Sequence, residues 1–192
     1  MNTHRACTLW IFVIAASAAS GCALLQKGDQ GAARYFSPER APMRPVAADA
    51  IRSAARPNRP KLRLGRVTGA LHLEERLVHR DSGNEIGFYR ELRWTEPPEL
   101  ALERLLARAL FEERGLGHVV GGPGPRLDVH LTAFDEVRGP EHLARAQVVA
   151  TLQDEQRVLW EETLTVDHAV SDLSSADAAT ATADALCEAL LA

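Results

Sequence analysis

The sequence predicts an α+β fold, a two-layer sandwich in which two helices pack on one face of a mixed, mostly antiparallel sheet. First, apolar and polar side chains alternate with a period of two in several short segments between residues 61 and 166, which is typical of antiparallel strands with one solvated face. Second, two longer stretches, at about 96–114 and 174–191, place apolar residues three and four positions apart. This spacing indicates amphipathic helices, whose apolar stripes pack against a sheet.

The first residues have the pattern of a secretion signal. His4 and Arg5 precede an apolar run, Leu9–Ala19, which is too short to span a bilayer as a stable helix. Small residues then lead to Cys22, which predicts a signal peptide at residues 1–21. The sequence Ala-Ser-Gly-Cys resembles the lipobox of bacterial lipoproteins, which implies cleavage before Cys22 and acylation of this residue. Ordinary secretion with an unmodified cysteine and an uncleaved anchor are the alternatives.

The three cysteines fit this interpretation. Cys7 would leave with the signal and Cys22 would carry lipid, so Cys187 would have no partner for an intramolecular disulfide. Each buried methylene contributes about 0.8 kcal/mol, so several acyl chains would hold the protein firmly at a membrane. Residue 23 is alanine. Aspartate there tends to retain enterobacterial lipoproteins in the inner membrane, so this resemblance implies an outer-membrane, periplasm-facing protein of a Gram-negative bacterium.

The rest of the chain is predicted to form one domain. The whole chain has 192 residues with ordinary proportions of apolar and charged side chains, which suffices for a single globular domain with extensions. Residues 22–34 are expected to be the lipidated cysteine and a flexible tether, and residues 35–192 a single α+β domain. Within it, residues 38–60 are a loop rich in proline and arginine, which suits either contact with anionic lipid head groups or, as we favour, a solvated linker. The net charge of −4 argues against a nucleic-acid binder.

The first half of the domain is predicted to form short strands and a hairpin. Tyr35-Phe36 is a candidate first strand, and residues 61–67 are a candidate second strand. Residues 81–84, Asp-Ser-Gly-Asn, are of types that favour a tight turn, so residues 77–80 and 85–94 are expected to pair as a hairpin. The apolar side chains expected to share one face of the last strand are Ile86, Phe88, Leu92 and Trp94.

This hairpin leads into the first predicted helix. Thr95 is placed to cap it, and Pro97 and Pro98 fit only its first turn, where a backbone N–H has no partner within the helix. Leucines and alanines between residues 102 and 110 then form one apolar stripe. Gly115 suits the position just after the helix, where a left-handed backbone is common.

The second half of the domain is predicted to add three longer strands and the second helix. A glycine-rich loop at residues 115–125 comes first. Residues 126–136, 144–152 and 157–166 then alternate apolar and polar side chains, and residues 174–191 carry an alanine-rich helical stripe. The side chains expected to share the apolar face of the last strand are Val158, Trp160, Leu164 and Val166.

No group of residues has the spacing of a catalytic or metal-binding site. The seven histidines lack a His-x3-His spacing and no Cys-x2-Cys pair occurs, so no metal ligands are predicted. A Gly-x-Ser-x-Gly elbow for a serine nucleophile is also missing. The glycine-rich segment Gly121–Gly124 lacks the Lys-Ser/Thr pair that follows in a phosphate-binding loop. We therefore predict a protein that is not an enzyme and uses no cofactor.

A signature of aromatic, arginine, tryptophan and proline residues is more specific. Its members are Phe88, Tyr89, Arg93, Trp94, Pro97 and Pro98. It is similar to the signature of the ABC-type transport auxiliary lipoproteins of the paraquat-inducible protein C type. The lipobox, Tyr35-Phe36, the segment Leu73–Arg80 and the alanine-rich C-terminal helix extend the resemblance. The chain departs from the family at His72, where an aromatic residue is common, and at Thr95, where alanine is usual.

The resemblance implies a non-catalytic role in transport. Such lipoproteins are outer-membrane components of systems with an ABC transporter and periplasmic MCE-domain proteins, which move phospholipid or other lipids between the inner and outer membranes. Some members assemble into homo-oligomeric rings, so a ring is an expectation here, and the signature residues are candidates for a partner surface. Two alternatives are an envelope assembly lipoprotein that serves lipopolysaccharide or peptidoglycan machinery, and a periplasmic hydrolase, which the missing nucleophile motif disfavours.

Overall fold

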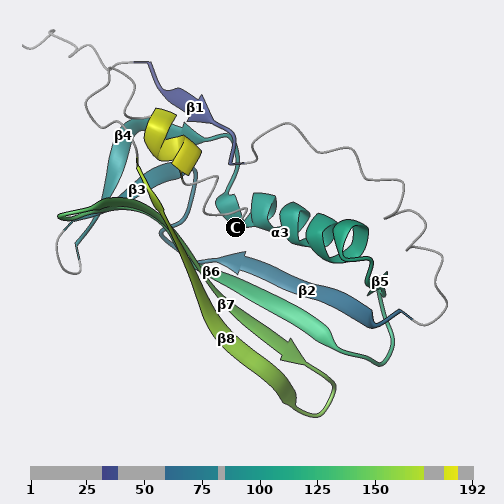
Figure 1. Cartoon of the computed structure of the whole chain (residues 1–192). Coiled ribbons are helices and arrows are strands. Elements are labelled where there is room, and N and C mark those ends of the chain that lie inside the picture. Colours follow the sequence, from purple (N-terminus) through teal and green to yellow (C-terminus); the bar gives the residue numbers. More distant parts are fainter. Residues whose placement is uncertain (1–31, 39–58, 82–84, 171–179, 186–192) are drawn as a thin grey trace, which may run out of the picture. The chain divides into compact units, whose positions relative to one another are not determined.

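The structure of the chain is a computed structural model. The residues that it describes are 32–38, 59–81, 85–170 and 180–185. They form a mixed sheet of eight strands, together with two helical segments (Figure 1). The predicted signal peptide, Cys22 and nearly all of the proline- and arginine-rich loop lie outside the described residues.

The strands differ greatly in length. In chain order they are β1 (Arg34–Phe36), β2 (Lys61–Gly69), β3 (Arg76–Arg80), β4 (Ile86–Trp94), β5 (Gly117–His118), β6 (Arg126–Arg138), β7 (His142–Gln153) and β8 (Val158–Ala169). One path through the sheet runs β1-β4-β3-β6-β2-β5, and β7 and then β8 extend the sheet from β6 (Figure 1).

Strand β6 is the centre of the sheet because both of its edges are paired. Along one edge, β2 pairs with Arg126–Leu131 and β3 pairs with Asp135–Val137, both in parallel. Along the other edge, β7 pairs antiparallel with β6 from Arg126 to Arg138. The register with β7 shifts between Leu131 and Ala133, at the point where β2 gives way to β3. A bulge of this kind re-aims the side chains that follow it.

The longest pairings are antiparallel, as the alternating pattern predicts. Strands β6, β7 and β8 form two successive hairpins with registers eleven or more residues long, and β3 pairs antiparallel with β4 as the expected hairpin. The parallel pairs, β1–β4, β2–β5, β2–β6 and β3–β6, are shorter. The predicted fold class, a mixed and mostly antiparallel sheet with two helices, is therefore confirmed.

The core lies between the sheet and the helices. Helix α3 (Pro98–Ala107) packs on β2, and its Leu102 joins the same buried cluster as Ala183 and Ala185 of the helical segment at residues 180–185. The rest of this predicted helix, residues 174–179 and 186–191, lies outside the described residues. No helix in the described part of the chain is long and apolar enough to cross a membrane.

The start of α3 corrects one prediction. Thr95 does not cap the helix, because Pro97 occupies the N-cap position and no side chain caps it. A residue before proline is driven away from helical backbone angles, and Pro97, which precedes Pro98, has φ −56° and ψ 134°. The helix therefore begins at Pro98, two residues later than predicted. Thr95 instead donates its backbone N–H to the carbonyl of Phe36, 2.8 Å away, and so extends the contact between β4 and β1.

The end of the helix differs in type but not in place. After α3 the chain continues as a π-helix, η2 (Arg108–Glu113), with wider turns than an α-helix. Gly115 follows with a positive φ of 67°, so it takes the left-handed conformation expected of the residue after a helix.

Two strands expose side chains that the period-2 pattern assigned to the apolar face. Phe88 is 43% exposed, although Leu92 and Trp94 of the same predicted set are buried. The β3–β4 register shifts between Arg76 and Val78, which breaks the simple alternation along β4. In β8, Val158, Trp160 and Leu164 are 40–54% exposed. Among the described residues β8 pairs only with β7, so it is an edge strand with little cover on either face.

Candidate functional site

The structure distributes the signature residues over three environments. Trp94 and Pro98 are buried in the core. Tyr89 belongs to a network of charged side chains in the sheet, and Arg93 and Pro97 line an open groove. The sixth residue, Phe88, lies on β4 and is partly exposed, as described above.

Trp94 connects three parts of the domain. Its indole packs against the Phe134 ring of β6, with 5.1 Å between ring centroids and a tilt of 34°. Its backbone N–H donates to the carbonyl of Glu75 at 2.6 Å, which ties the loop before β3 to the end of β4. Since both rings are almost fully buried, their main role is to hold β4 and β6 in one core.

Tyr89 lies in a network around a buried carboxylate. The Tyr89 hydroxyl donates to Oε2 of Glu136 at 2.6 Å, and the same oxygen accepts from Nε of Arg138 at 2.8 Å. The Arg138 guanidinium also lies 5.0 Å from the centre of the Tyr89 ring, within range of a cation–π contact. Burial, and then the hydrogen bond to Glu136, raise the pKa of Tyr89. Glu136 is 2% exposed, so these donors compensate for most of its lost hydration.

A second buried carboxylate is the neighbour of the first. Asp135 is fully buried, and its Oδ2 accepts from Nε of Arg80 on β3 at 2.8 Å. Ala133, Phe134, Asp135 and Glu136 are buried in succession, so both faces of β6 are covered here. The alternation in the sequence does not predict this, because it depends on the bulge and on cover from several elements.

One glycine makes room for the network. A Cβ at Gly87 would lie 2.2 Å from Cε1 of His79, whose ring stands edge-on to the Tyr89 ring at 5.3 Å. Because Gly87 has no side chain, it leaves room beside β4 for the His79 ring. His79 Nδ1 in turn lies 3.5 Å from Oδ2 of Asp81. These are internal packing and polar contacts, and the described residues hold no group of three His, Cys, Asp or Glu side chains that could bind a metal.

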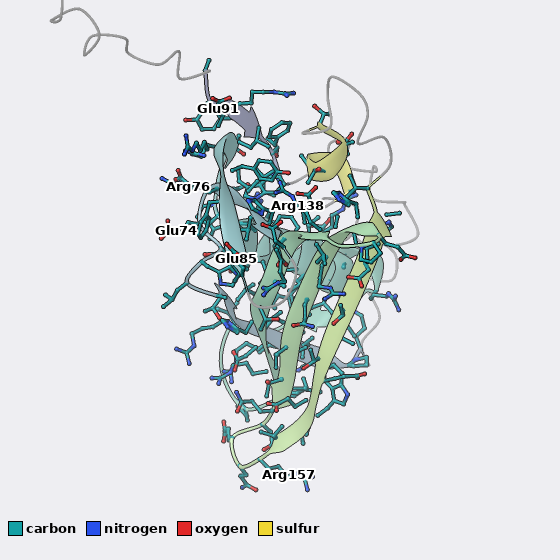
Figure 2. All side chains as sticks on the ribbon, turned by 90° about the vertical axis from the view of Figure 1, so that its left-hand side faces the viewer. Glu74, Arg76, Glu85, Glu91, Arg138 and Arg157 are labelled. Carbon is teal, nitrogen blue, oxygen red and sulfur yellow. The ribbon has the colours of Figure 1, made fainter. Side chains whose placement is uncertain are left out.

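An open groove lies where the loop before β3, the end of β4 and the start of α3 meet. It encloses about 550 Å³, and the residues that line it are Leu73, Glu74, Glu75, Arg76, Arg93, Pro97 and Glu99. The side chains of Glu74 and Arg76 project from the same side of the ribbon (Figure 2).

Backbone hydrogen bonds fix the walls of this groove. Leu73 N–H donates to Ala70 at 2.8 Å and Ala70 N–H donates to Leu131 of β6 at 2.9 Å, which holds the loop in place. On the opposite wall, Nη1 of Arg93 donates to the carbonyls of Tyr89 and Leu92, at 3.1 and 3.0 Å. The groove therefore has fixed walls and side chains of both charges.

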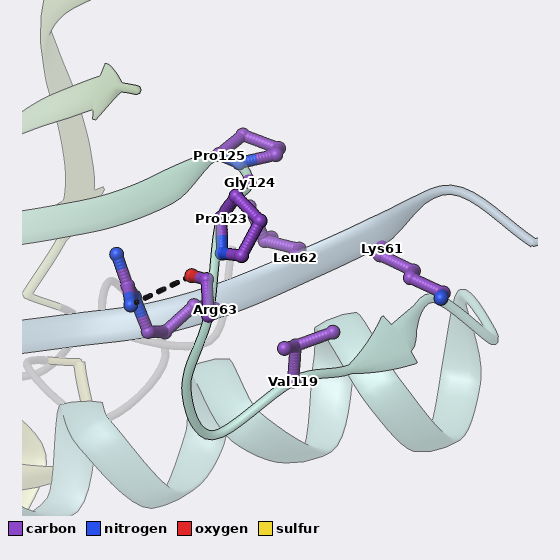
Figure 3. A pocket seen from close by; sticks show the side chains of 8 residues that line it. Lys61, Leu62, Arg63, Val119, Pro123, Gly124 and Pro125 are labelled. Carbon is purple, nitrogen blue, oxygen red and sulfur yellow. Dashed lines mark hydrogen bonds between the residues drawn. The ribbon is translucent and has the colours of Figure 1, made fainter. Parts of the chain in front are cut away.

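The glycine-rich loop forms a second, much smaller cavity against β2 (Figure 3). Its volume is about 10 Å³, which leaves room for a single water at most. Nη1 of Arg63 donates to the carbonyl of Gly122 at 3.3 Å, and Gly122 and Gly124 have positive φ angles. The loop is thus a turn held by an arginine.

Comparison with known proteins agrees with the sequence signature. A family model described as "ABC-type transport auxiliary lipoprotein component" matches residues 45–191. The solved structure of protein XCC0632 from Xanthomonas campestris has a TM-score of 0.60 and 23% identity, and the match covers 82% of this chain and 88% of that one.

A second solved structure, of an uncharacterized protein, has a TM-score of 0.56 and 12% identity over 83% of this chain and 95% of that one. At these identities both structures show a shared fold. No curated protein sequence matches this chain.

Proposed function

Because the chain belongs to the ABC-type transport auxiliary lipoprotein family, we propose that it is a non-catalytic, membrane-anchored component of a system that moves phospholipid or related lipids between the inner and outer membranes. The observation that carries this proposal is the family match, which spans residues 45–191 and includes every described element from β2 onward. The transport family itself supports the step to an envelope system, and the nature of the cargo is our inference.

The arrangement of charged side chains supports a binding role. The two buried carboxylates, Asp135 and Glu136, are held by Arg80, Arg138 and Tyr89, so they are committed to the interior of the sheet. The groove, in contrast, presents charged side chains to the outside on fixed walls. A scaffold component needs such a surface for docking and needs no reacting group.

We place the anchor at Cys22 and the domain at the periplasmic face of the outer membrane. The signal peptide is residues 1–21, and the tether at residues 22–34 leads into β1, which starts at Arg34. In this arrangement the acyl chains hold the domain at the membrane and the domain positions the transport conduit.

The proposed partners are a periplasmic MCE-domain protein and, through it, the ABC transporter, and the active form is a homo-oligomeric ring. We propose that the groove-lining residues Arg93 and Pro97 and the exposed Phe88 contribute to the docking surface, whereas Trp94 and Pro98 support it from the core. Tyr89 stabilises β4 from its inner face through Glu136.

Affinity purification from the native membrane tests the proposed system. The full-length chain, tagged at its C-terminus and crosslinked in cells, is expected to bring down an MCE-domain protein and the ATPase of an ABC transporter. Recovery of an outer-membrane barrel protein or a peptidoglycan synthase in their place would favour the envelope-assembly alternative and contradict our proposal.

A Cys22→Ala variant tests the anchor. Without the thiol, the chain is expected to keep its signal peptide and to lose incorporation of radiolabelled palmitate. Normal processing and labelling of the variant would show that the lipobox interpretation is wrong. A Cys187→Ala variant is the matched control, because it removes the other cysteine of the predicted mature chain and should be processed and labelled normally.

A further inference from the structure

The groove at the start of α3 contains a carboxylate without a counter-ion. Glu99 is the second residue of the helix, and its Oε2 is buried with no donor in the described part of the chain. A Cβ at Gly69 would lie 2.8 Å from this oxygen, so the glycine leaves the space that the carboxylate occupies. Buried charged oxygens are normally paired or hydrogen-bonded. Oδ1 of Asp135 is also buried without a donor among the described residues, but Asp135 lies inside the sheet, whereas Glu99 lines an open groove, where a partner can supply the missing donor.

The strand wall of the groove carries two guanidinium groups, and the neighbouring strand β1 adds an aromatic ring beside it. The β3–β4 register places Arg76 beside Arg93, and the β1–β4 register places Tyr35 on the other side of Arg93. Tyr35 is 65% exposed. Arg93 is already engaged by the carbonyls of Tyr89 and Leu92, which fixes its position in the β4 wall. Arginine and tyrosine in such exposed rows are the side chains most often found at the energetic centres of protein interfaces.

An exposed leucine borders the same groove. Leu71 is 97% exposed in the loop between β2 and β3, two residues before Leu73, which lines the groove. Another exposed aliphatic side chain, Val120 at 87%, follows β5, which pairs with the opposite end of β2, and it serves as a comparison for Leu71. An occupant that covers Leu71 as well as the charged lining has to be larger than a small ion, which favours a polypeptide.

We propose that this groove binds an extended segment of a partner protein, which places a lysine or arginine side chain against Glu99 while an apolar neighbour covers Leu71 and Tyr35. The lining contains three carboxylates, Glu74, Glu75 and Glu99, against two guanidinium groups, so the balance of charge favours a basic over an acidic segment. The identity of the partner rests on the proposed function, but the charge and position of the segment do not.

A peptide titration tests the charge without the partner. The full chain, solubilised in detergent and labelled for NMR, is titrated with the peptides acetyl-Leu-Lys-Leu-amide and acetyl-Leu-Glu-Leu-amide. We expect amide shifts at residues 71–76, 93–96 and 99 with the lysine peptide, and a loss of about tenfold in affinity in Glu99→Gln. Glu103→Gln, an exposed carboxylate one turn along α3, is the matched control and should bind as the wild type does. Equal binding of the acidic peptide, no shifts with either peptide, or binding unaffected by Glu99→Gln would overturn the proposal.

A second measurement uses the proposed partner. The purified periplasmic domain of the MCE-type protein encoded with the transporter is immobilised, and binding of the full chain is measured by interferometry. Leu71→Ser should weaken binding about tenfold and Val120→Ser should leave it unchanged. If the partner binds and both Leu71→Ser and Glu99→Gln bind as well as the wild type, the groove is not the docking site, although the proposed function stands. If only the lysine peptide binds, the partner is wrong and the groove inference stands. Urea midpoints of all variants confirm that they fold.

Discussion

The two ends of the long hairpin strands share one backbone pattern but differ in cover. Toward β3 and β4, the residues Ala133–Glu136 of β6 are buried in succession, and the Trp94 and Phe134 rings pack against each other at a tilt of 34° in the core. Toward the β7–β8 turn, marked by Arg157 in Figure 2, Val158 and Trp160 are 54% and 40% exposed. An alternating strand therefore becomes core or surface according to the elements that lie against it.

Two ion pairs with similar nitrogen–oxygen distances make the same comparison, although the second pair has a further hydrogen bond, from Nη2 of Arg145 to Oδ2 of Asp167 at 2.8 Å. Nε of Arg80 lies 2.8 Å from Asp135, and Nε of Arg145 lies 2.7 Å from Asp167. Asp135 is fully buried, whereas both side chains of the second pair are 33% exposed. Distance alone does not set the contribution of an ion pair to stability. When one partner is removed by mutation, the loss in the free energy of unfolding depends on whether water can reach the charge that remains.

The tryptophans should show the largest contrast. Trp94→Ala removes a ring that is 1% exposed, so it should lower the free energy of unfolding by about 3–5 kcal/mol. Trp160 is 40% exposed, so Trp160→Ala should lower the free energy of unfolding by less than about 1 kcal/mol. Urea unfolding followed by far-ultraviolet circular dichroism measures both. Similar losses would show that the β7–β8 end is covered in solution, for example by a second copy.

The next largest difference in stability is expected between variants of the two ion pairs. Arg80→Ala leaves the Asp135 carboxylate buried without its partner and should destabilise the chain by about 2–3 kcal/mol, somewhat below the loss for a fully buried pair because Arg80 is 26% exposed. Arg145→Ala should cost at most about 1 kcal/mol. The same urea titration at low and high salt measures the pair of variants. An equal effect of the two substitutions would contradict the assigned difference in burial.

Substitution of Tyr89 should have a smaller effect on stability, and this effect should depend on pH. Tyr89→Phe removes a hydrogen bond to a charged group and should cost about 1–2 kcal/mol at neutral pH. Because the pKa of Tyr89 is raised, its contribution is complete below about pH 10, the ordinary tyrosine value, and is lost as the pH rises through the folded value. In a Tyr35→Phe background Tyr89 is the only tyrosine, and its absorbance titration should shift to lower pH when urea unfolds the chain. An unchanged midpoint would exclude the buried hydrogen bond.

The smallest effect on stability is expected from Asp167, the carboxylate of the exposed ion pair. The hydrogen bond from Arg145 lowers the pKa of Asp167, so this carboxylate contributes stability above about pH 4, which is lost as the pH falls through its folded value. Asp167→Asn should therefore cost less than about 1 kcal/mol at pH 7 and nothing near pH 2. Unfolding midpoints of the variant and the wild type should converge in acid, and a difference that persists there would point to a packing role instead.

The candidate site was only partly predictable. The signature Phe88–Pro98 identified the family, and two of its residues, Arg93 and Pro97, line the groove in the structure. It did not indicate that Trp94 and Arg93, adjacent in the chain, serve the core and the surface respectively. Glu99 was absent from the candidates because a carboxylate in the first turn of a helix is explained by the helix dipole alone. Its role emerges from the enclosed oxygen above Gly69, which is a tertiary relation.

The sequence by itself determined the properties that depend on neighbours in the chain. Period-2 alternation set the hairpins β3–β4 and β6–β7–β8, the proline pair set the start of α3 to within two residues, and Gly115 set its end. Tertiary structure alone decided which of these elements are covered. The bulge in β6 and the strands on both of its edges bury Asp135 and Glu136, while β8, at the edge, stays open. The reason is that burial depends on contacts between segments far apart in the chain, which local periodicity does not encode.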